Sequence, residues 1–349
     1  MKLNDIKRIG IVKLGSIGDI IHTLPAAYSL RVNFPNAQID WIIERKSMEI
    51  LTGNRFINNI IVIDTKAWRK NPLGKRTINS IRSLLNYFKK ASYDMVFDFQ
   101  GLIKSGVIAY LTRSPKRIGF NPEECREGLN RLFMNMISSP TDSKTHVIDK
   151  NLNILKSLDL DISSIHFPFS FQNGDERPID EYFIENKLTK DDFIAVIDPS
   201  AGWITKCIDL DLQAKIVDYL TEKYGCKVVI MWGPGEHEKA LKIKELSKSN
   251  LLILCKTNLK NLASFLRRCD LMISPDTGPM HLAAALSVRC IGIYGPTCPY
   301  KNGPYGEEHL FISKFVDCAP CYKRECNDLK CIKTITFDDI KKKIDIALK

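Results

Sequence analysis

Short apolar runs alternate along the chain with longer segments in which apolar residues recur at helical spacing. Runs such as residues 8–13 and 193–198 are apolar at successive positions, which is typical of parallel strands buried on both faces. Residues 211–224, 236–247 and 259–268 show the helical period instead. The pattern predicts an α/β fold, with further strands at residues 38–43, 94–98, 117–120, 227–232, 251–254, 271–274 and 290–294.

The alternation forms two series, separated by residues 166–182, where proline and glycine lie among polar residues and the periodic pattern lapses. A chain of 349 residues is long enough for two domains of ordinary size. We therefore predict doubly wound sheets in domains 1–175 and 176–349, with ligands at the carboxyl ends of the strands. A final amphipathic helix is predicted at residues 337–348, capped by Thr336.

One predicted strand leads directly into an alanine-rich helix through a turn that suits an anion. Thr277 can cap the helix, Gly278 allows close approach to the backbone, and Pro279 lies where a missing N–H is harmless. Such a helix start presents free N–H groups and a positive dipole end. With Asp276 and His281 beside it, the turn could hold a diphosphate and sugar hydroxyls, although the same residues also fit a capped core helix.

A second turn follows the first predicted strand and contains Gly15, Gly18 and Asp19. The two glycines form a loop that a ligand can approach, but their spacing matches neither the dinucleotide fingerprint nor the Walker loop. A carboxylate at a helix start often only complements the helix dipole. The functional alternative is that Asp19 acts as a general base that deprotonates a sugar hydroxyl.

The chain is basic, with 51 lysines and arginines against 40 acidic residues and a net charge of +11. This excess favours an anionic partner, and its denser zones, residues 66–90 and 113–131, both lie in the first half. We find no helix-turn-helix, zinc-finger or aromatic-basic strand pattern, so we do not predict nucleic-acid binding. The first residues contain no signal-peptide apolar run, which favours a cytoplasmic protein.

Four of the eleven cysteines gather in a cysteine-rich loop, residues 318–331. A zinc or iron–sulfur centre is possible there, although a second Cys-x-x-Cys pair is absent and the spacing is compressed. Reduced structural thiols are the alternative, because a chain without an export signal meets a reducing environment. The four candidate ligands are Cys318, Cys321, Cys326 and Cys331.

Four separated motifs give the sequence a specific resemblance. They are Lys-Leu-Gly-Ser-Ile-Gly-Asp at 13–19, Phe-Asp-Phe-Gln-Gly-Leu-Ile-Lys-Ser at 97–105, Pro-Ser-Ala-Gly-Trp with Lys206 at 199–206, and Asp-Thr-Gly-Pro-Met-His at 276–281. In this order they are similar to bacterial glycosyltransferases of family nine, and nearest to the ADP-heptose:lipopolysaccharide heptosyltransferase I group. The resemblance implies a GT-B fold, in which two Rossmann-like domains face each other across a cleft.

The resemblance also implies a role for each matching residue. Asp19 corresponds to the catalytic base and Lys206 to the lysine that contacts the donor diphosphate. The implied donor-binding residues are Ser200, Ala201, Lys206, Glu236, Asp276, Thr277, Gly278 and His281, with Glu238 as the alternative to Glu236. The implied acceptor-binding residues are Ser16, Arg69, Lys104 and Arg126. Cys207 departs from the family, which has arginine after the phosphate-binding lysine.

The implied reaction is an inverting transfer of L-glycero-D-manno-heptose from ADP-heptose to the Kdo region of the lipopolysaccharide inner core, without a required metal or cofactor. The implied partners are ADP-heptose, a Kdo-lipid A acceptor and the anionic cytoplasmic face of the inner membrane, where the protein is expected to be peripheral. Three alternatives stay open: another family-nine transferase of heptosyltransferase II or III type, a GT-B nucleotide-sugar epimerase, and a non-enzymatic module that binds anionic glycolipid.

Overall fold

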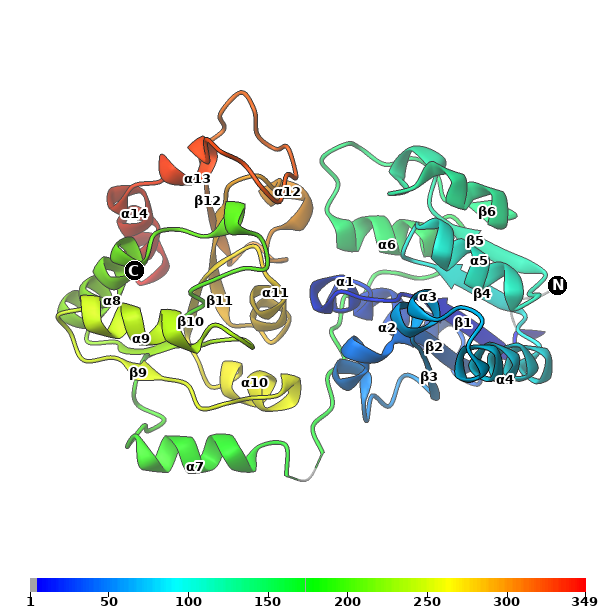
Figure 1. Cartoon of the computed structure of the whole chain (residues 1–349), viewed down its shortest axis with the longest axis horizontal. Coiled ribbons are helices and arrows are strands. Elements are labelled where there is room, and N and C mark those ends of the chain that lie inside the picture. The colour runs from blue at the N-terminus through cyan, green and yellow to red at the C-terminus, as the bar shows by residue number, and fades with distance from the viewer. Residues whose placement is uncertain (1–4, 173) are drawn as a thin grey trace. The chain divides into compact units, whose positions relative to one another are not determined.

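The chain forms two compact units, Met1–Ser170 and Phe171–Lys349. The computed structural model describes residues 5–172 and 174–349 (Figure 1). The division lies inside the polar segment 166–182 that separates the two series of strands, at Ser170 rather than at the predicted residue 175. The chain thus divides where its hydrophobic pattern lapses.

Unit 1 contains a six-stranded sheet in the order β3-β2-β1-β4-β5-β6, with every neighbouring pair parallel. Its two central strands are almost completely buried, because helices cover the sheet on each side. The strands are β1 (Arg8–Val12), β2 (Gln38–Glu44), β3 (Asn59–Ile63), β4 (Met95–Asp98), β5 (Lys116–Gly119) and β6 (Met136–Ile137).

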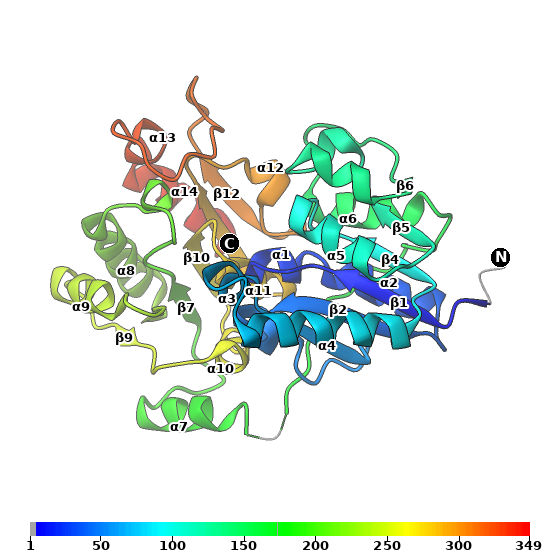
Figure 2. The same ribbon diagram turned by 45° about the vertical axis from the view of Figure 1, so that its right-hand side comes forward.

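The long helix α4 (Lys75–Ala91) packs only one face against the core of unit 1, through Phe88 and Ala91 among others (Figure 2). Its exposed side carries polar and basic residues together with two apolar ones, Ile78 and Leu85. The other helices of unit 1 are α1 (Ile17–Ile21), α2 (Leu24–Asn33), α3 (Thr65–Lys70), α5 (Ile103–Leu111) and α6 (Val147–Lys156), with short 3₁₀ turns η2 (Arg45–Leu51), η3 (Pro122–Glu124) and η4 (Gly128–Phe133).

Unit 2 repeats this architecture in a second parallel sheet, with the order β12-β11-β10-β7-β8-β9. In both units the first and fourth strands lie side by side at the centre, so the chain reverses its direction of winding there. The strands of unit 2 are β7 (Ile194–Ile197), β8 (Lys227–Ile230), β9 (Leu252–Ile253), β10 (Leu271–Pro275), β11 (Arg289–Tyr294) and β12 (Leu310–Ser313).

Helix ends in unit 2 are fixed by local sequence. Thr336 caps the last helix, because its hydroxyl accepts from the N–H of Asp339 while that carboxylate accepts from Thr336 in return. The helices are α7 (Arg177–Glu185), α8 (Leu210–Tyr224), α9 (His237–Leu246), α10 (Leu259–Leu266), α11 (Gly278–Ala285), α12 (Pro299–Asn302), α13 (Lys330–Lys333) and α14 (Phe337–Ala347), with a 3₁₀ turn η5 (Ile204–Lys206).

The structure confirms the α/β prediction and contains every predicted strand, with each end within two residues of the predicted one. It also contains three strands that the pattern did not predict: β3, β6 and β12. All three lie at sheet edges and are only partly buried. β6 has only two residues, whereas the apolar runs of β3 (residues 60–63) and β12 (residues 310–312) were overlooked.

Candidate active site

The predicted site residues of each unit follow the carboxyl ends of its strands. In unit 1, Asp19 follows β1 and Lys104 follows β4, the two strands between which the winding reverses. In unit 2, Lys206 follows β7 and Asp276 follows β10, which are again the two central strands. A reversal of this kind leaves a crevice at the ends of the strands, where doubly wound sheets bind ligands.

In unit 2 the structure brings Asp276, Lys206 and His281 together. Lys206 Nζ lies 2.8 Å from Asp276 Oδ2, and His281 Nε2 lies 3.3 Å from Asp276 Oδ1. The three side chains are almost completely buried, and Lys206 Nζ also donates to the carbonyl oxygen of Asp276 at 3.0 Å. Residues 70 positions apart in the sequence are therefore joined into one charged group.

Asp276 is held in its charged form. Burial raises the pKa of this carboxyl group. The hydrogen bond with His281 and the charge of Lys206 together lower it by more, so the pKa lies well below its usual range. Asp276 can therefore accept hydrogen bonds from a ligand but cannot donate a proton at neutral pH. This suits a carboxylate that binds sugar hydroxyls.

Thr277 occupies the N-cap position of α11, but its hydroxyl does not cap the helix, contrary to the prediction. The hydroxyl instead donates to Asp198 Oδ2 at 2.8 Å and lies 3.0 Å from the hydroxyl of Ser274. The first N–H groups of α11 are thereby left to other acceptors, which favours an anion-binding turn over a simply capped core helix. Pro279 lies in the first turn, as predicted.

Asp198 is a buried carboxyl group that the sequence prediction overlooked. It follows β7 and accepts from Thr277 and, at 3.4 Å, from the N–H of Ser200. Burial raises its pKa to about 7, because desolvation outweighs these hydrogen bonds. Asp198 thus links the turn after β7 to the turn after β10. Its position at the end of a predicted strand could have identified it as a candidate from the sequence.

The turn after β7 contains a buried hydroxyl that suits a ligand. Ser200 Oγ is buried and makes no hydrogen bond to any atom of residues 5–172 and 174–349. A buried polar atom without a partner is uncommon and costs free energy unless a ligand or water completes it. Next to it, the N–H of Ala201 lies 3.3 Å from the sulfur of Cys207, so the residue that departs from the family closes this turn.

Glu236 binds its own loop in this structure. Its Oε2 accepts from the N–H of Gly233 at 2.9 Å, and the residue stands at the N-cap of α9. Glu238, the alternative, lies in the first turn of the same helix. Both follow β8, so either carboxylate lies at the carboxyl edge of the sheet.

In unit 1, Asp19 and Ser16 form the start of α1. Asp19 Oδ2 accepts from the N–H of Ser16 at 3.1 Å, so one carboxylate oxygen complements the helix start. Gly15 has φ +153, a conformation that L side chains rarely adopt, and a Cβ there would meet Ser47 at 3.2 Å. The loop therefore requires glycine at this position.

The turn after β4 clamps this loop. Gln100 Oε1 accepts from the N–H of Leu14 at 3.0 Å, and Asp98 accepts from the N–H of Gln100 at 2.8 Å. Asp98 also accepts from Ser105 and Asn130 at 2.8 and 2.6 Å, and burial raises its pKa. The Asp-x-Gln-Gly motif is thus structural support for the Asp19 loop.

Lys13 lies buried beneath the Asp19 loop, another functional candidate that the sequence prediction did not assign. Its Nζ donates to the carbonyl oxygen of Phe99 at 2.6 Å, and burial lowers its pKa. The charges of Asp19, Asp98 and Arg126 all act on this ammonium group, which shows that they lie near it. Asp19 and Arg126 thus act on the same buried lysine, with opposite effects on its pKa.

The other basic candidates of unit 1 also lie beyond strand ends. Lys104 Nζ lies 3.6 Å from Glu44, the last residue of β2, while Arg69 is exposed on α3. Ser16 and Arg126 are exposed as well. The four acceptor candidates thus follow β1, β3, β4 and β5 at one edge of the sheet.

The four clustered cysteines gain no support as a metal site. Cys331 is buried, whereas Cys318 and Cys326 are exposed. Among residues 5–172 and 174–349, no three His, Cys, Asp or Glu side chains are arranged to hold a metal ion, and all eleven cysteines are free thiols. In the same part of the chain no helix is long and apolar enough to cross a membrane.

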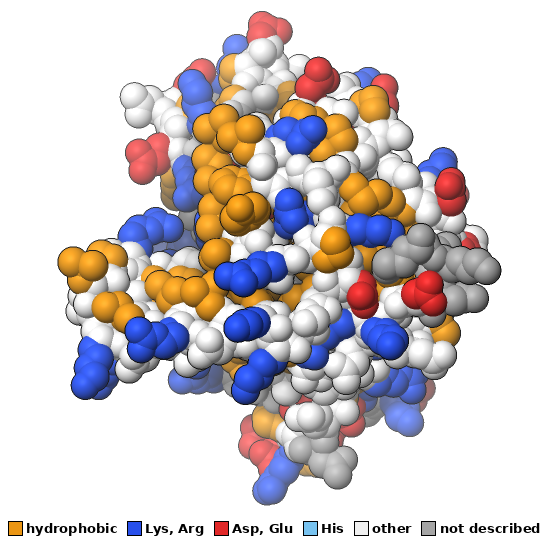
Figure 3. Space-filling view, turned by 90° about the vertical axis from the view of Figure 1, so that its right-hand side faces the viewer, with side chains coloured by type: hydrophobic (Ala, Val, Ile, Leu, Met, Phe, Trp, Pro, Cys, Tyr) orange, Lys and Arg blue, Asp and Glu red, His pale blue; other side chains and the backbone are white. Residues whose placement is uncertain are grey.

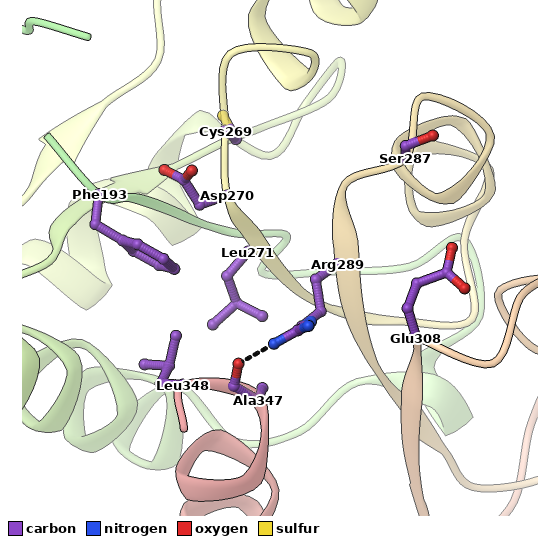
Figure 4. A pocket seen from close by; sticks show the side chains of 9 residues that line it. All are labelled: Phe193, Cys269, Asp270, Leu271, Ser287, Arg289, Glu308, Ala347 and Leu348. Carbon is purple, nitrogen blue, oxygen red and sulfur yellow. Dashed lines mark hydrogen bonds between the residues drawn. The ribbon is translucent and has the colours of Figure 1, made fainter. Parts of the chain in front are cut away.

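A cavity of about 360 Å³ in unit 2 lies away from these turns (Figure 4). Leu271 and Arg289, the first residues of β10 and β11, line it, and Arg289 donates to the carbonyl oxygen of Ala347. The cavity therefore lies at the amino ends of the strands, the edge opposite to Asp276.

Comparison with known proteins identifies the family of the chain and supports the fold. The model of the family described as Glycosyltransferase family 9 (heptosyltransferase) matches residues 81–332. Lipopolysaccharide heptosyltransferase 1 of Pseudomonas aeruginosa is 28% identical over 330 residues, with 91% of this chain and 87% of the relative covered. The enzyme of the same name from Escherichia coli K12 is 27% identical over 304 residues, covering 87% and 92%.

The structure of the E. coli heptosyltransferase WaaC with ADP superposes with a TM-score of 0.76 at 25% identity, covering 97% of this chain and 99% of that one. The GT-B fold predicted from the resemblance is thereby confirmed. The protein is a glycosyltransferase with two Rossmann-like units. More particularly, the chain belongs to glycosyltransferase family 9, the heptosyltransferase family.

Proposed function

We propose that this protein transfers L-glycero-D-manno-heptose from ADP-heptose to the Kdo region of the lipopolysaccharide inner core, with inversion at the anomeric carbon. The observation that carries the proposal is the buried group of Lys206, Asp276 and His281 between the central strands of unit 2. It offers a cation for a diphosphate and a carboxylate for sugar hydroxyls in one place. The names of the relatives, lipopolysaccharide heptosyltransferase 1, support the heptose donor and this acceptor.

In the proposed reaction Asp19 removes the proton from the acceptor hydroxyl, which attacks the anomeric carbon from the face opposite ADP. Positive charge builds on the sugar ring, as in other glycosyl transfers. Lys206 and the first N–H groups of α11, at Thr277 and Gly278, stabilise the negative charge on the departing diphosphate. Ser200 and Ala201 supply the turn beside these phosphates, and Glu236 contacts the nucleoside.

We assign the acceptor to the basic residues of unit 1. Arg69, Lys104 and Arg126 meet the carboxylates of the Kdo sugars, with Ser16 beside Asp19. Support comes from their common position beyond the strand ends and from the charges of Arg126 and Asp19, which both act on Lys13. The reaction requires no cofactor or metal, because ADP is already a good leaving group.

We further propose that the protein works in the cytoplasm as a peripheral protein of the inner-membrane surface. One side of α4 presents an exposed stripe of alternating basic and apolar residues, spaced three or four positions apart, and the face of unit 1 in Figure 3 shows basic and hydrophobic side chains intermingled. The stripe consists of Lys75, Ile78, Arg82, Leu85 and Lys89. Such a mixture suits an anionic bilayer, where Kdo-lipid A is embedded.

A nucleotide titration tests the donor assignment. We expect the protein to bind ADP more tightly than UDP or GDP, and Lys206→Ala to weaken ADP binding by about 1.5–3 kcal/mol, since it removes a charge-assisted hydrogen bond. Lys215→Ala, an exposed lysine on α8, is the matched control. Equal affinity of parent and Lys206→Ala for ADP would move the donor site elsewhere.

A second family member type, heptosyltransferase II or III, differs in its acceptor rather than its donor. Two acceptors distinguish the types. An enzyme of heptosyltransferase I type adds heptose to Kdo-lipid A, whereas the other types need an acceptor that already carries heptose. An epimerase would instead convert a nucleotide sugar without any acceptor. Incubation with donor alone, followed by analysis of the sugar, decides that alternative.

A further inference from the structure

The cysteine-rich loop, residues 318–331, is bound to the turn that carries the donor-binding lysine. The hydroxyl of Thr205 donates to the carbonyl oxygen of Lys323 at 2.9 Å. The N–H of Cys321 donates to the carbonyl oxygen of Pro296 at 3.0 Å, just after β11. The loop thus lies at the carboxyl edge of the sheet of unit 2, on the same side as Asp276.

Trp203 brings an arginine of this loop beside Lys206. The guanidinium carbon of Arg324 lies 5.2 Å from the centroid of the Trp203 ring, and Lys206 Nζ lies 4.3 Å from the same centroid. Both cations therefore contact the same ring, which places them in the same turn. Cation–π attraction favours both positions.

The charges at this place are unequally used. Lys206 is paired with Asp276, so its positive charge is largely balanced before any ligand binds. Arg324 is exposed, and none of the ion pairs formed within residues 5–172 and 174–349 includes it. A nucleotide sugar brings two negative phosphates, which a single paired lysine does not balance.

We propose that Arg324 is a further donor-binding residue, whose guanidinium group hydrogen-bonds the diphosphate beside Lys206. The inference rests on the proposed function, since it takes a nucleoside diphosphate as the ligand of this turn. The planar fork of arginine matches two phosphate oxygens at once, which a lysine cannot do. The cysteine-rich loop then has a task in unit 2: it carries Arg324 to the donor, and Trp203 orients it.

The test compares Arg324→Ala with Lys323→Ala in the full-length protein. The two variants remove the same charge from adjacent positions of one loop, but only Arg324 lies over Trp203. Calorimetric titration with ADP, AMP and adenosine compares ligands that carry two, one and no phosphates. We expect Arg324→Ala to weaken ADP binding about 10-fold or more, to weaken AMP less and to leave adenosine unchanged. Lys323→Ala should bind all three like the parent.

Arg324→Lys should recover part of the lost affinity, and Arg324→Gln, which keeps a polar side chain without the charge, should not. Unchanged thermal midpoints would confirm that the variants are folded. The inference is overturned if Arg324→Ala binds ADP like the parent, or if it loses adenosine as much as ADP. If the parent itself binds none of ADP, UDP and GDP, the proposed function fails as well.

Discussion

Asp276 shows how one residue acquires its chemistry from its surroundings. Burial alone would favour the neutral carboxylic acid, yet Lys206 and His281 hold it charged. A buried ion pair by itself stabilises a fold little, so stability does not explain why these charges are buried. Binding of a ligand does explain it. The residue-scale evidence therefore points to a binding site for a sugar diphosphate.

Asp19 is the residue on which the proposed chemistry depends. We expect Asp19→Ala to lower kcat about 10²- to 10⁴-fold, the usual contribution of a general base, while ADP affinity stays the same. Steady-state kinetics and calorimetry measure the two effects separately.

Asp19→Asn separates catalysis from helix capping, because the amide oxygen can still accept from the N–H of Ser16 but cannot take up a proton. This variant should be as inactive as Asp19→Ala. An active Asp19→Asn enzyme would mean that the carboxylate only supports the start of α1.

Asp198 gives a pH dependence with a definite sign. Its pKa is raised from 3.8 to about 7 by burial, so the folded state binds the proton more tightly than the unfolded chain. Its contribution to stability is therefore greatest below pH 4 and is lost as the pH rises toward 7. Since a pKa difference of one corresponds to about 1.4 kcal/mol, the loss amounts to as much as about 4 kcal/mol.

Asp198→Asn removes this titration. Urea unfolding between pH 4 and pH 8 should show a flatter profile for the variant than for the parent. The same slope in both proteins would mean that another group carries the dependence. Asp218→Asn is a suitable control, because the pKa of Asp218 is lowered and its carboxylate therefore stays charged in the folded protein over this range.

The sequence predicted Asp19, Lys206 and Asp276 because each stands in a motif at a predicted strand end. It could not predict that Asp198 binds Thr277, or that Arg324 lies over Trp203, since those pairs are far apart in the chain. Thr277 was assigned as a cap from its position alone, and its hydroxyl found a stronger acceptor in the carboxyl group of Asp198.

At the scale of elements, all the central strands were predicted, but of the edge strands only β9 was. A strand such as β7 is apolar at every position because both faces are covered. By contrast, β6 has only two residues, too few for a pattern, and the short apolar runs of β3 and β12 were overlooked. The site depends on β1, β4, β7 and β10, and the sequence predicted all four.

The exposed stripe of α4 predicts binding to anionic membranes. In sedimentation with vesicles, the parent should bind phosphatidylglycerol-containing membranes and not neutral phosphatidylcholine, and added salt should weaken binding. Arg82→Ala with Lys89→Ala should weaken it about 30-fold, because each basic residue near an anionic surface contributes about 1 kcal/mol.

Lys215→Ala with Lys244→Ala removes two exposed lysines from α8 and α9 and serves as the control. These two substitutions should leave vesicle binding nearly unchanged. Equal losses in both double variants would indicate a response to net charge rather than a surface on α4.

At the scale of the whole molecule, two sheets with the same strand order carry complementary chemistry. The switch point of unit 1 carries a carboxylate beside exposed basic residues, and that of unit 2 carries a cation and a carboxylate suited to a sugar diphosphate. The division between the units lies where the hydrophobic pattern lapses, so this organisation could be predicted from the sequence. The assignment of acceptor to unit 1 and donor to unit 2 stays a prediction.

The most direct test is a transfer assay with purified protein, ADP-heptose and Kdo-lipid A. We expect one heptose to be added to the acceptor, detected as a single mass increment. The anomeric configuration should be inverted, and ADP should be released in equal amount. Activity should persist with a metal chelator present. Hydrolysis or epimerisation of ADP-heptose without transfer, or transfer with retained configuration, would contradict the proposed function.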